Sequence, residues 1–318
     1  MATRATTGGG GVPDLAAVGS VTIRVMSSLS RAQFQPLVTI VTPSFNQGEF
    51  VADAIDSVLA QDYPRIEYLV VDGGSTDATV DVLRSYGDRV RWTSGPDAGQ
   101  VDAIHRGFLA GSGEYLAWLN SDDRFVPGAI RAAIDELAID PSAALLYGGA
   151  EFIDRQGAGL GPCRQIEAWS LERLVDVTDF VVQPATVFRR DAYLAVGGLD
   201  PALHYCMDYD LWIRLGQRYQ VLYLTRLLAQ VRIYGETKTA TGGLTRLDEI
   251  ERMIRRNGGA GLPADFRREM WLELRYALAA AARRRQLARA ARLAMRIMPY
   301  GARAAIRKLR RIRSSGRR

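Results

Sequence analysis

Residues 115–123, Tyr115-Leu116-Ala117-Trp118-Leu119-Asn120-Ser121-Asp122-Asp123, are the stretch of this sequence that says most about its fold. Five apolar residues in a row predict a buried strand, and the polar run before Pro127 predicts the turn where that strand ends. Adjacent carboxylates at the carboxyl end of a strand offer hard oxygen ligands where α/β proteins bind their ligands. The stretch therefore suggests a divalent cation that carries a diphosphate. A solvated turn that caps the next helix is the plainer alternative, since Asp and Asn are common there.

The segments on either side repeat the pattern of a short apolar run, a polar turn and a helix. Further strands are predicted at residues 37–42, 66–71, 90–93 and 143–147. Short strands that alternate with helices predict βαβ units and a mostly parallel sheet. Because parallel strands point the same way, their terminal turns gather at one edge and form a ligand crevice. Neither G-x-G-x-x-G nor a Walker lysine motif occurs at these turns, which argues against dinucleotide and P-loop binding.

Composition limits the class and the compartment of the protein. The chain has 318 residues and is 47% hydrophobic, which is enough for a large core plus extensions. Its two cysteines, Cys163 and Cys206, form neither a disulfide framework nor a zinc spacing, so both are expected as free thiols in a reducing compartment. We find no apolar run of about 18 residues and no signal-peptide layout at the N-terminus. These features predict a cytoplasmic protein with a flexible, glycine-containing leader over residues 1–35.

Positive charge is concentrated at the C-terminal end. Residues 283–318 contain fourteen Lys or Arg and no Asp or Glu, so the net charge of +6 for the whole chain leaves −8 for the remainder. From Gln286 to Met298 the helical period gathers one apolar stripe among the arginines, formed by Leu287, Ala290, Ala291, Ala294, Ile297 and Met298. Such a basic helix predicts contact with an anionic membrane surface, at the inner face of the plasma membrane. Packing of the stripe on the rest of the protein and a solvated tail are the alternatives.

Five segments together resemble family 2 glycosyltransferases of the GT-A fold, in their order and in their spacing. The similarity extends over residues 37–239 and is strongest in the first half. The segments are Pro43-Ser44-Phe45-Asn46-Gln47, residues 56–64, residues 70–79, Pro96-Asp97-Ala98-Gly99-Gln100 and Trp118-Leu119-Asn120-Ser121-Asp122-Asp123.

This resemblance implies a Rossmann-like α/β/α sandwich with a mostly parallel central sheet and a C-terminal helical extension. It places a GT-A domain at residues 36–240, with a nucleotide-sugar-binding half at 36–150 and an acceptor-binding half at 151–240. Residues 241–318 remain as a helical basic region. The implied reaction is an inverting transfer from a nucleotide-diphosphate sugar to a hydroxyl of a saccharide or lipid-linked acceptor, in cell-surface polysaccharide or glycolipid synthesis.

The resemblance also implies residue roles in the first half. Asp72 is expected to hydrogen-bond the base, and Gly73 to let the backbone approach the ligand. Asp122 and Asp123 fall on the metal-binding motif for Mg²⁺ or Mn²⁺, while Asn120 stands where Asp is frequent, so the ion would depend more on the two aspartates, water and donor phosphates. The full expected nucleotide-sugar site is Pro43, Ser44, Asn46, Asp72, Gly73, Asp97, Gln100, Asn120, Ser121 and Asp122.

In the second half, Asp208 aligns with a motif whose aspartate acts as general base, although Met207 stands where Glu is common. An unperturbed Asp is a weak base unless desolvation or a neighbouring carboxylate raises its pKa, and Asp210 is the expected neighbour. Capping of the helix that begins near Met207 is the alternative role for both aspartates.

Residues 231–239 are expected to close over the donor as a lid. Tyr234 stands where related enzymes often carry His, but Arg232 and Lys238 can meet phosphate charge, unless both are surface cations. Family position further suggests Gln183 and Thr186 as acceptor contacts, and His204 is expected to face the acceptor.

Two other functions remain open at this point. The arginine-rich tail would suit nucleic-acid binding, because clustered cations attract phosphate backbones; the acidic remainder of the chain argues against it, so no specific nucleic acid is expected. Asn120, Met207 and Tyr234 depart from the family pattern, which leaves a non-catalytic nucleotide-sugar-binding scaffold as the second alternative.

Overall fold

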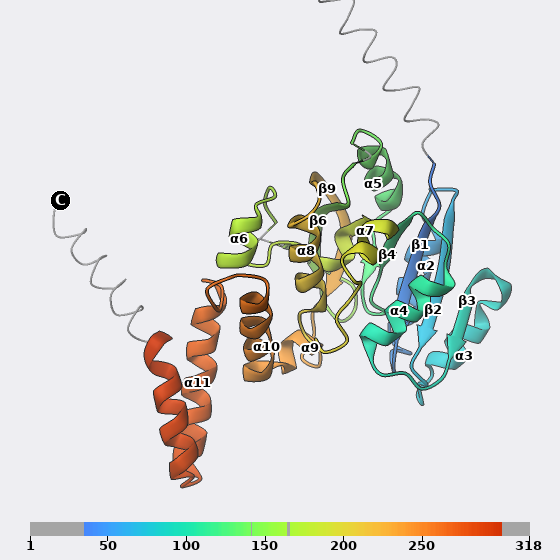
Figure 1. The fold of residues 1–318 in the computed structure, drawn as a ribbon. Coiled ribbons are helices and arrows are strands. Elements are labelled where there is room, and N and C mark those ends of the chain that lie inside the picture. The colour runs from blue at the N-terminus through green and yellow to red at the C-terminus, as the bar shows by residue number, and fades with distance from the viewer. Residues whose placement is uncertain (1–34, 141, 164–165, 301–318) are drawn as a thin grey trace, which may run out of the picture.

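The computed structural model describes residues 35–140, 142–163 and 166–300 of the chain, which fold around one sheet with helices on both sides (Figure 1). The strands are β1 (Val38–Ser44), β2 (Ile66–Asp72), β3 (Arg91–Ser94), β4 (Tyr115–Trp118), β5 (Arg124–Phe125), β6 (Leu145–Ile153), β7 (Gly159–Pro162), β8 (Thr186–Arg189) and β9 (Val221–Arg232). The helices are α2 (Val51–Leu59), α3 (Thr79–Ser85), α4 (Gln100–Ala110), α5 (Ala129–Leu137), α6 (Leu171–Asp176), α7 (Arg190–Ala195), α8 (Met207–Gly216), α9 (Lys238–Thr241), α10 (Gly243–Arg256) and α11 (Phe266–Arg283). Two 3₁₀ turns, η1 (Gly87–Arg89) and η2 (Gln183–Ala185), and a helical segment over 287–300 complete the description.

Among the described residues the sheet has nine strands, eight of them in the order β3-β2-β1-β4-β8-β6-β9-β5, with β7 paired to β6. Strands β1 to β4 are mutually parallel, β8 runs against both β4 and β6, and β9 is parallel to β6. Six of the nine therefore point in one direction. The predicted α/β fold with a mostly parallel sheet is confirmed.

Alternation along β4 explains how the sheet is covered on both faces. Leu116 and Trp118 belong to one hydrophobic cluster, and Tyr115 and Ala117 to the other. Because successive side chains of a strand point to opposite faces, a strand that is apolar throughout must be covered twice. Helices α4 and α8 contribute to the first cluster, and α2 and α5 to the second. Cys163 and Cys206 are buried free thiols, as expected.

The four strands predicted in the first half and the one at 143–147 all occur, but the second half is richer than its sequence pattern indicates. Strand β6 continues to Ile153, and β9 pairs alongside it over most of its length. The register between the two strands shifts at Gly148, Gly149 and Ala150, which breaks the simple alternation of a strand. β9 was therefore not predicted.

The C-terminal helices pack on the body through α10. Leu247, Ile250 and Ile254 lie in the same hydrophobic cluster as Leu211 and Trp212 of α8. The predicted division at residue 240 stays a prediction, although described residues on both sides of it share this cluster. Residues 1–34 of the leader predicted over 1–35, and the part of the basic tail from residue 301, lie outside the described residues.

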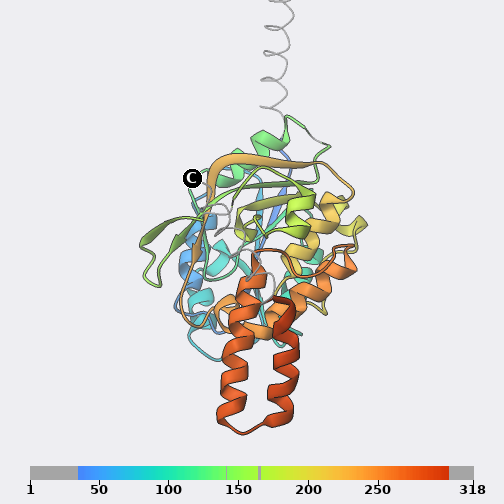
Figure 2. The same ribbon diagram turned by 90° about the vertical axis from the view of Figure 1, so that its left-hand side faces the viewer.

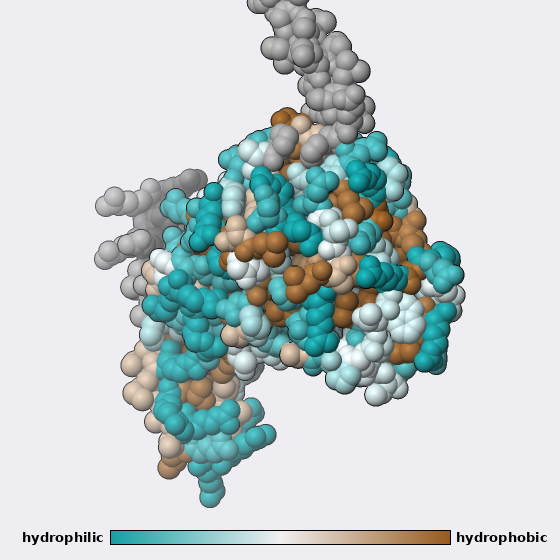
Figure 3. Space-filling model, turned by 45° about the vertical axis from the view of Figure 1, so that its right-hand side comes forward, coloured by the Kyte–Doolittle hydropathy of each residue, from teal (hydrophilic) through white to brown (hydrophobic). Residues whose placement is uncertain are grey.

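Helix α11 and the segment 287–300 form an antiparallel pair that projects from the body (Figure 2). In the predicted apolar stripe, Ala290 and Ile297 pack against the core cluster, whereas Leu287 is 80% exposed and Met298 64%. The stripe is thus divided between packing and solvent. Hydrophilic side chains dominate the surface of this projection, with a few apolar ones between them (Figure 3). Within the described residues, no helix has the length and apolar character needed to cross a bilayer.

Candidate active site

The parallel strands bring three polar residues side by side at one edge. Ser44 ends β1 opposite Asp72 at the end of β2, and Asp72 in turn lies opposite Ser94 at the end of β3. The sequence prediction that strand-end turns gather at one edge is borne out by this register.

The carboxylate of Asp72, which is expected to bind a base, accepts hydrogen bonds from its own turn and from the end of β3. Its Oδ2 accepts hydrogen bonds from the Gly74 N–H (3.1 Å), the Ser75 N–H (2.9 Å) and the Ser94 hydroxyl (2.6 Å), and its Oδ1 from the Ser75 hydroxyl (2.5 Å). A carboxylate accepts about four hydrogen bonds, and the side chain is only 1% exposed. These bonds show that Asp72 shapes the turn, and its expected contact with a base stays a prediction.

Asp97 lies in the space next to that turn. A Cβ added at Gly73 would come within 2.8 Å of Asp97 Oδ2, so the glycine is needed for the carboxylate to approach. Asp97 Oδ1 accepts a hydrogen bond from the Gly99 N–H (2.8 Å), and no other residue of the described chain donates to Oδ2. Of the two aspartates at this edge, Asp97 retains a vacant acceptor.

Residues 43–46 form the neighbouring wall. Pro43 and Ser44 are buried, and the Ser44 hydroxyl finds no hydrogen-bond partner among the described residues. Asn46 adopts φ 53°, in the left-handed region, and its side-chain oxygen accepts a hydrogen bond from the Thr76 N–H (2.9 Å). A buried hydroxyl without a partner is costly in a finished core but is suitable at a site where a ligand supplies the missing bond.

A chain of amide side chains connects this edge to the second half of the molecule. Lys238 Nζ donates to Gln100 Oε1 (2.8 Å), and Gln100 Nε2 donates to Asn120 Oδ1 (2.8 Å). Asn120 Nδ2 donates to Asp123 Oδ2 and to Gln183 Oε1, both at 3.1 Å. Asn120 thus works as a connector, which its amide can do because it both donates and accepts.

The two adjacent aspartates have different environments. Asp123 is 4% exposed, and its Oδ1 accepts the backbone N–H of Arg232 (3.0 Å) in addition to the Asn120 bond at Oδ2. Burial, reinforced by the charge of Asp122, raises its pKa well above the ordinary value. Each oxygen of Asp123 holds one protein group and keeps a lone pair, so the role of Asp123 as a metal ligand stays a prediction. Ser121, between Asn120 and Asp122, is also buried.

Of the two adjacent aspartates after β4, Asp122 has the carboxylate oxygen that is free of protein hydrogen bonds. Its Oδ2 accepts the Tyr234 hydroxyl (2.9 Å), and Oδ1 receives no hydrogen bond from another described residue. Burial raises its pKa, and the tyrosine bond opposes that effect. Among the described residues no cluster of three or more His, Cys, Asp or Glu could hold a metal. This donor set still fits Mg²⁺ or Mn²⁺, since such ions take one or two carboxylates and complete their shell with water and substrate phosphates.

The expected lid is in contact with this aspartate. Besides its bond to Asp122, the ring of Tyr234 lies 5.1 Å from the ring of Phe50. Arg155 stacks over both rings, at 5.5 and 5.4 Å, and makes ion pairs with Glu49 (2.7 Å) and Glu236 (3.1 Å). These contacts hold residues 234–236 against the residues that lead into α2.

Arg232 is not available to a phosphate. The side chain is 3% exposed, and its guanidinium donates to Asp53 Oδ2 (2.7 Å) and to three backbone carbonyls, those of Asp122, Asp154 and Arg155. A guanidinium has five N–H groups in a fixed plane, so these contacts leave little for a ligand. The expected phosphate or surface role of Arg232 is corrected to a structural one.

Asp208 lies in the first turn of α8, partly buried, and the only described hydrogen bond to its carboxylate comes from the adjacent Tyr209 N–H (2.8 Å). Burial raises its pKa, while the charge of Lys238 lowers it. Asp179, between α6 and η2, is raised well above its ordinary pKa by burial and then by the charge of Asp208. Asp179 is therefore the neighbouring carboxylate, and the sequence did not reveal it.

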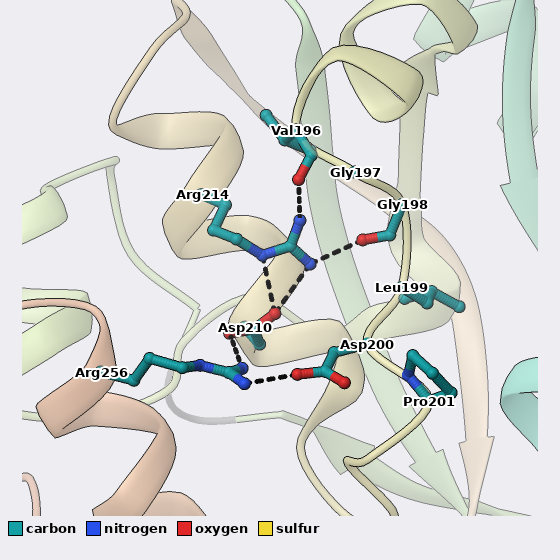
Figure 4. A pocket seen from close by; sticks show the side chains of 9 residues that line it. All are labelled: Val196, Gly197, Gly198, Leu199, Asp200, Pro201, Asp210, Arg214 and Arg256. Atoms are coloured by element: carbon teal, nitrogen blue, oxygen red, sulfur yellow. Dashed lines mark hydrogen bonds and ion pairs between the residues drawn. The ribbon is translucent and has the colours of Figure 1, made fainter.

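Asp210, expected in that role, points toward Arg214 and Arg256 (Figure 4). It is fully buried and accepts ion pairs from Arg214 (2.7 Å) and Arg256 (2.8 Å), beside a shallow pocket of about 360 Å³ that Asp200 also lines. Residues two apart on a helix point in different directions. The predicted contact of Asp210 with Asp208 or an acceptor is wrong for this reason.

The residues predicted to contact the acceptor differ in their exposure to solvent. Gln183 and Thr186 are buried, with Gln183 bonded to the Trp118 carbonyl (2.8 Å) and Thr186 to the Gln183 carbonyl (2.7 Å), so both predicted acceptor contacts are corrected. His204 is exposed, and burial of its ring atoms followed by the charge of Lys238 lowers its pKa. His204 and Lys238 remain acceptor-side candidates.

The α/β fold thus combines a strand-end edge whose donor set suits phosphate and a cation with a carboxylate, that of Asp208, which has few hydrogen bonds. The sequence profile described as Glycosyl transferase family 2 matches residues 39–163. An uncharacterized glycosyltransferase of Rickettsia typhi is 31% identical over 230 residues, which cover 69% of this chain and 70% of that protein. The chain belongs to glycosyl transferase family 2.

More distant proteins are also similar. The chondroitin synthase of Escherichia coli is 26% identical over 204 residues, which are 63% of this chain and 29% of the synthase. The structure of S. aureus TarS 1–349 in complex with UDP-GlcNAc superposes with a TM-score of 0.58 at 14% identity, covering 75% of this chain and 71% of that one. The mannosyltransferase PcManGT of Pyrobaculum calidifontis, in complex with GDP-Man and Mn²⁺, gives 0.56 at 16% identity, covering 93% and 96%. Both structures share the fold.

Proposed function

We propose that this glycosyltransferase moves a sugar, with inversion, from a nucleotide-diphosphate donor to an acceptor hydroxyl, and that Asp208 is the general base. The observation that carries the proposal is the state of Asp208: its carboxylate is partly buried, nearly free of protein hydrogen bonds and raised in pKa by burial. A base needs an unoccupied oxygen within reach of the hydroxyl and a pKa above that of an ordinary Asp.

In this reaction the acceptor hydroxyl gives its proton to Asp208 while its oxygen forms a bond to the anomeric carbon. The bond from that carbon to the diphosphate oxygen breaks, and the nucleoside diphosphate leaves with the electron pair. Mg²⁺ or Mn²⁺, held by Asp122 and donor phosphates, would neutralise the charge on the leaving group. Lys238, hydrogen-bonded to Gln100, is the protein cation that lies nearest to both halves of this site by its contacts.

For the nucleotide we propose Asp97, in place of Asp72, as the acceptor of a base N–H, with Ser44 completing a hydrogen bond to the donor. Uracil, thymine and guanine all present such an N–H, so a carboxylate excludes none of them. The test is thermal shift against UDP-, GDP- and dTDP-sugars with and without Mn²⁺, since a ligand of the native state raises the melting temperature. Asp97→Asn should lose most of the shift, and an undiminished shift would remove Asp97 from the site.

Asp208→Asn provides the test of the base. Transfer should fall at least a hundredfold, within the range that general bases contribute, while the donor-induced thermal shift persists. Retention of transfer in this variant would refute the proposed base, and absence of transfer from the wild-type protein with every donor would favour the scaffold function.

For the acceptor side we propose a saccharide or lipid-linked substrate of cell-surface polysaccharide or glycolipid synthesis, met at the cytoplasmic face of an anionic membrane. Support comes from the projecting helices: residues 283–300 carry six arginines and no acidic residue, and Leu287 is the most exposed large apolar side chain among those described. Arginines with apolar residues between them suit a lipid surface better than a nucleic-acid backbone, which needs only the charge.

Vesicle flotation tests the membrane contact, with phosphatidylcholine alone and with added phosphatidylglycerol. Serine at Arg283, Arg284 and Leu287 together should weaken binding to the anionic vesicles about a hundredfold, since each surface cation contributes about 1 kcal/mol. Leu109→Ser, at another exposed leucine, is the control. Equal binding to both vesicle types, or tighter binding to duplex DNA, would contradict the proposal.

A further inference from the structure

Glu249, on α10 in the C-terminal region, reaches the segment that leads into the helix of the proposed base. Its Oε1 accepts the backbone N–H groups of Tyr205 (2.5 Å), Cys206 (3.1 Å) and His204 (3.0 Å), and Oε2 also lies 3.0 Å from the His204 nitrogen. The carboxylate is 6% exposed. Three consecutive N–H donors directed at one buried carboxylate is an arrangement that fixes the backbone rather than a chance surface contact.

Helix α8 lacks a cap of its own. Cys206 is its N-cap residue and its side chain accepts no hydrogen bond from the first turn. The first N–H groups of a helix need acceptors, and a negative charge there also complements the helix dipole. Glu249 supplies the charge just before Met207 and Asp208, from a helix about forty residues further along the chain.

Asp210 provides a second contact between the first turn of α8 and the end of α10. Asp210 Oδ1 accepts hydrogen bonds from Arg256 (2.8 Å) and Asn257 (2.9 Å), which lie at the C-terminal end of α10 (Figure 4). The two contacts are on either side of Asp208 along the chain. α10 therefore limits both translation and rotation of the turn that carries the proposed base.

The charges around Asp208 give Glu249 a second, measurable effect. Lys238 of α9 lowers the pKa of Asp208, Glu249 of α10 raises it, and Asp179 before η2 interacts with Asp208 as a like charge. Arg246 of α10 faces Asp179 and lowers the pKa of that carboxyl. Removal of the Glu249 charge should therefore lower the pKa of Asp208.

We propose that Glu249 is a positioning residue for Asp208: its carboxylate fixes the 204–206 backbone and so aims the base at the acceptor hydroxyl. This inference rests on the proposed role of Asp208. It assigns to the C-terminal helices a direct part in the geometry of the reaction, although the family profile matches only residues 39–163.

The experiment compares Glu249→Gln, Glu249→Asp and Glu251→Gln in the full chain. Glu251 is a charge-matched control on the same helix, where it pairs with Arg255 (2.9 Å). Glu249→Gln should lower kcat about ten- to a hundredfold, the cost of a small misplacement, with little change in the donor KM. Amide hydrogen exchange at residues 204–206 should accelerate.

The pH profile separates positioning from a loss of stability. In Glu249→Gln the acidic limb of kcat should move to lower pH, because a base of lower pKa stays deprotonated further into acid. Glu249→Asp keeps the charge, so its acidic limb should stay near that of the wild type while part of kcat returns. Glu251→Gln should match the wild type in every respect.

Wild-type kcat and acidic limb in Glu249→Gln, or a lower melting temperature with normal kcat per folded molecule, would overturn the positioning role. Asp208→Asn distinguishes the two levels of failure. If that variant is inactive and Glu249→Gln is normal, only the positioning inference fails; if Asp208→Asn is active, the proposed base and this inference fail together.

Discussion

Asp179 and Asp208 form a buried pair of like charges, at a cost to stability that the fold must offset elsewhere. Burial raises the pKa of both, and the charge of Asp208 adds to the effect on Asp179. A group whose pKa is higher in the folded state binds more protons there than in the unfolded chain. Its contribution to stability is therefore favourable in acid and is lost as the pH rises through the raised pKa.

Asp179→Asn removes the stability loss that the ionised carboxylate of Asp179 causes at neutral pH. At pH 7 we expect the free energy of unfolding to rise, because the neutral amide no longer places a second negative charge beside Asp208. The gain should shrink as the pH is lowered toward the ordinary range of Asp. Urea unfolding at several pH values measures this, with Asp88→Asn in the surface turn η1 as control. A variant that is less stable at pH 7 than the wild type would show that Asp179 has a structural partner that outweighs the repulsion.

At the same scale, the sequence predicted which residues reach the site better than it predicted their contacts. Asp122 and Asp208 lie where their motifs suggested, because a residue at a strand end or in a first helical turn is placed by local structure. Arg232 and Asp210 were misjudged because they have partners, Asp53 and Arg256, that are distant in the sequence. Orientation of a side chain depends on those partners, and no periodicity reports them.

Among the elements, the contact of α4 with β1 sets the distance between a helix and the sheet. A Cβ built on Gly107 would lie 2.5 and 2.7 Å from the two Cγ atoms of Val41, which is fully buried. The glycine costs helix stability but lets the helix lie close to the strand.

Gly107→Ala thus sets two effects against each other. Alanine gains about 1 kcal/mol in helix propensity, and overpacking against a buried valine costs about 1–3 kcal/mol. We expect net destabilisation of about 1 kcal/mol by urea unfolding. Gly159→Ala, where the added Cβ meets nothing within 4 Å, should be near neutral. Unchanged or increased stability of Gly107→Ala would mean that the helix can shift without loss.

The contacts of Arg155 with residues 234–236 lead to a prediction about local opening rather than global stability. Its ion pairs with Glu49 and Glu236 are about half exposed, so Arg155→Ala should change global stability little. Locally, however, Tyr234 loses the guanidinium that stacks over its ring. Hydrogen exchange at residues 233–237 should accelerate, and donor hydrolysis should rise relative to transfer. Arg84→Ala, which removes an exposed pair with Asp81, is the matched control. Unchanged exchange in Arg155→Ala would show that Tyr234 and Asp122 hold the segment unaided.

Helices and strands could be predicted where the sequence repeats the pattern of a short apolar run, a polar turn and an amphipathic helix. Strands β1 to β4 are each followed by a polar turn and, further along, by a helix, and all four were anticipated. β9 was not, because its pairing with β6 shifts register at Gly148 and Gly149, and because its residues alternate between buried and half-exposed positions without a regular period. β8 begins only at Thr186, because η2 occupies the three residues before it, where Pro184 lacks the N–H that a sheet ladder requires.

At the scale of the whole molecule, core packing joins the two halves of the site, in addition to the hydrogen bonds of Lys238, Gln100 and Asn120. Trp118, at the end of β4, stacks on Trp212 of α8 with ring centroids 5.6 Å apart. Asp122 follows the first tryptophan and Asp208 precedes the second by one turn. The distance between the cation edge and the proposed base is therefore set by core packing. Since α10 packs on the other side of α8, the C-terminal helices form part of the same framework.

A chain ended at residue 240 tests this framework. Between residues 241 and 280 alone it would lose seven buried apolar side chains that belong to the shared cluster, each contributing about 1.5–3 kcal/mol when fully buried. Their sum, roughly 10–20 kcal/mol, matches or exceeds the whole stability of an ordinary domain. The residues are Leu247, Ile250, Met253, Ile254, Leu262, Met270 and Leu274.

We expect the 240-residue chain to lack a cooperative thermal transition and to bind a hydrophobic dye, because the face of α8 that α10 covers would be open to water. A chain ended at residue 300 keeps every contact described between α8, α10 and α11, and should melt like the full protein. Circular dichroism with dye fluorescence distinguishes the two. A 240-residue chain that melts cooperatively and binds donor would make residues 36–240 an independent domain, and α10 would then be a support that the core does not need.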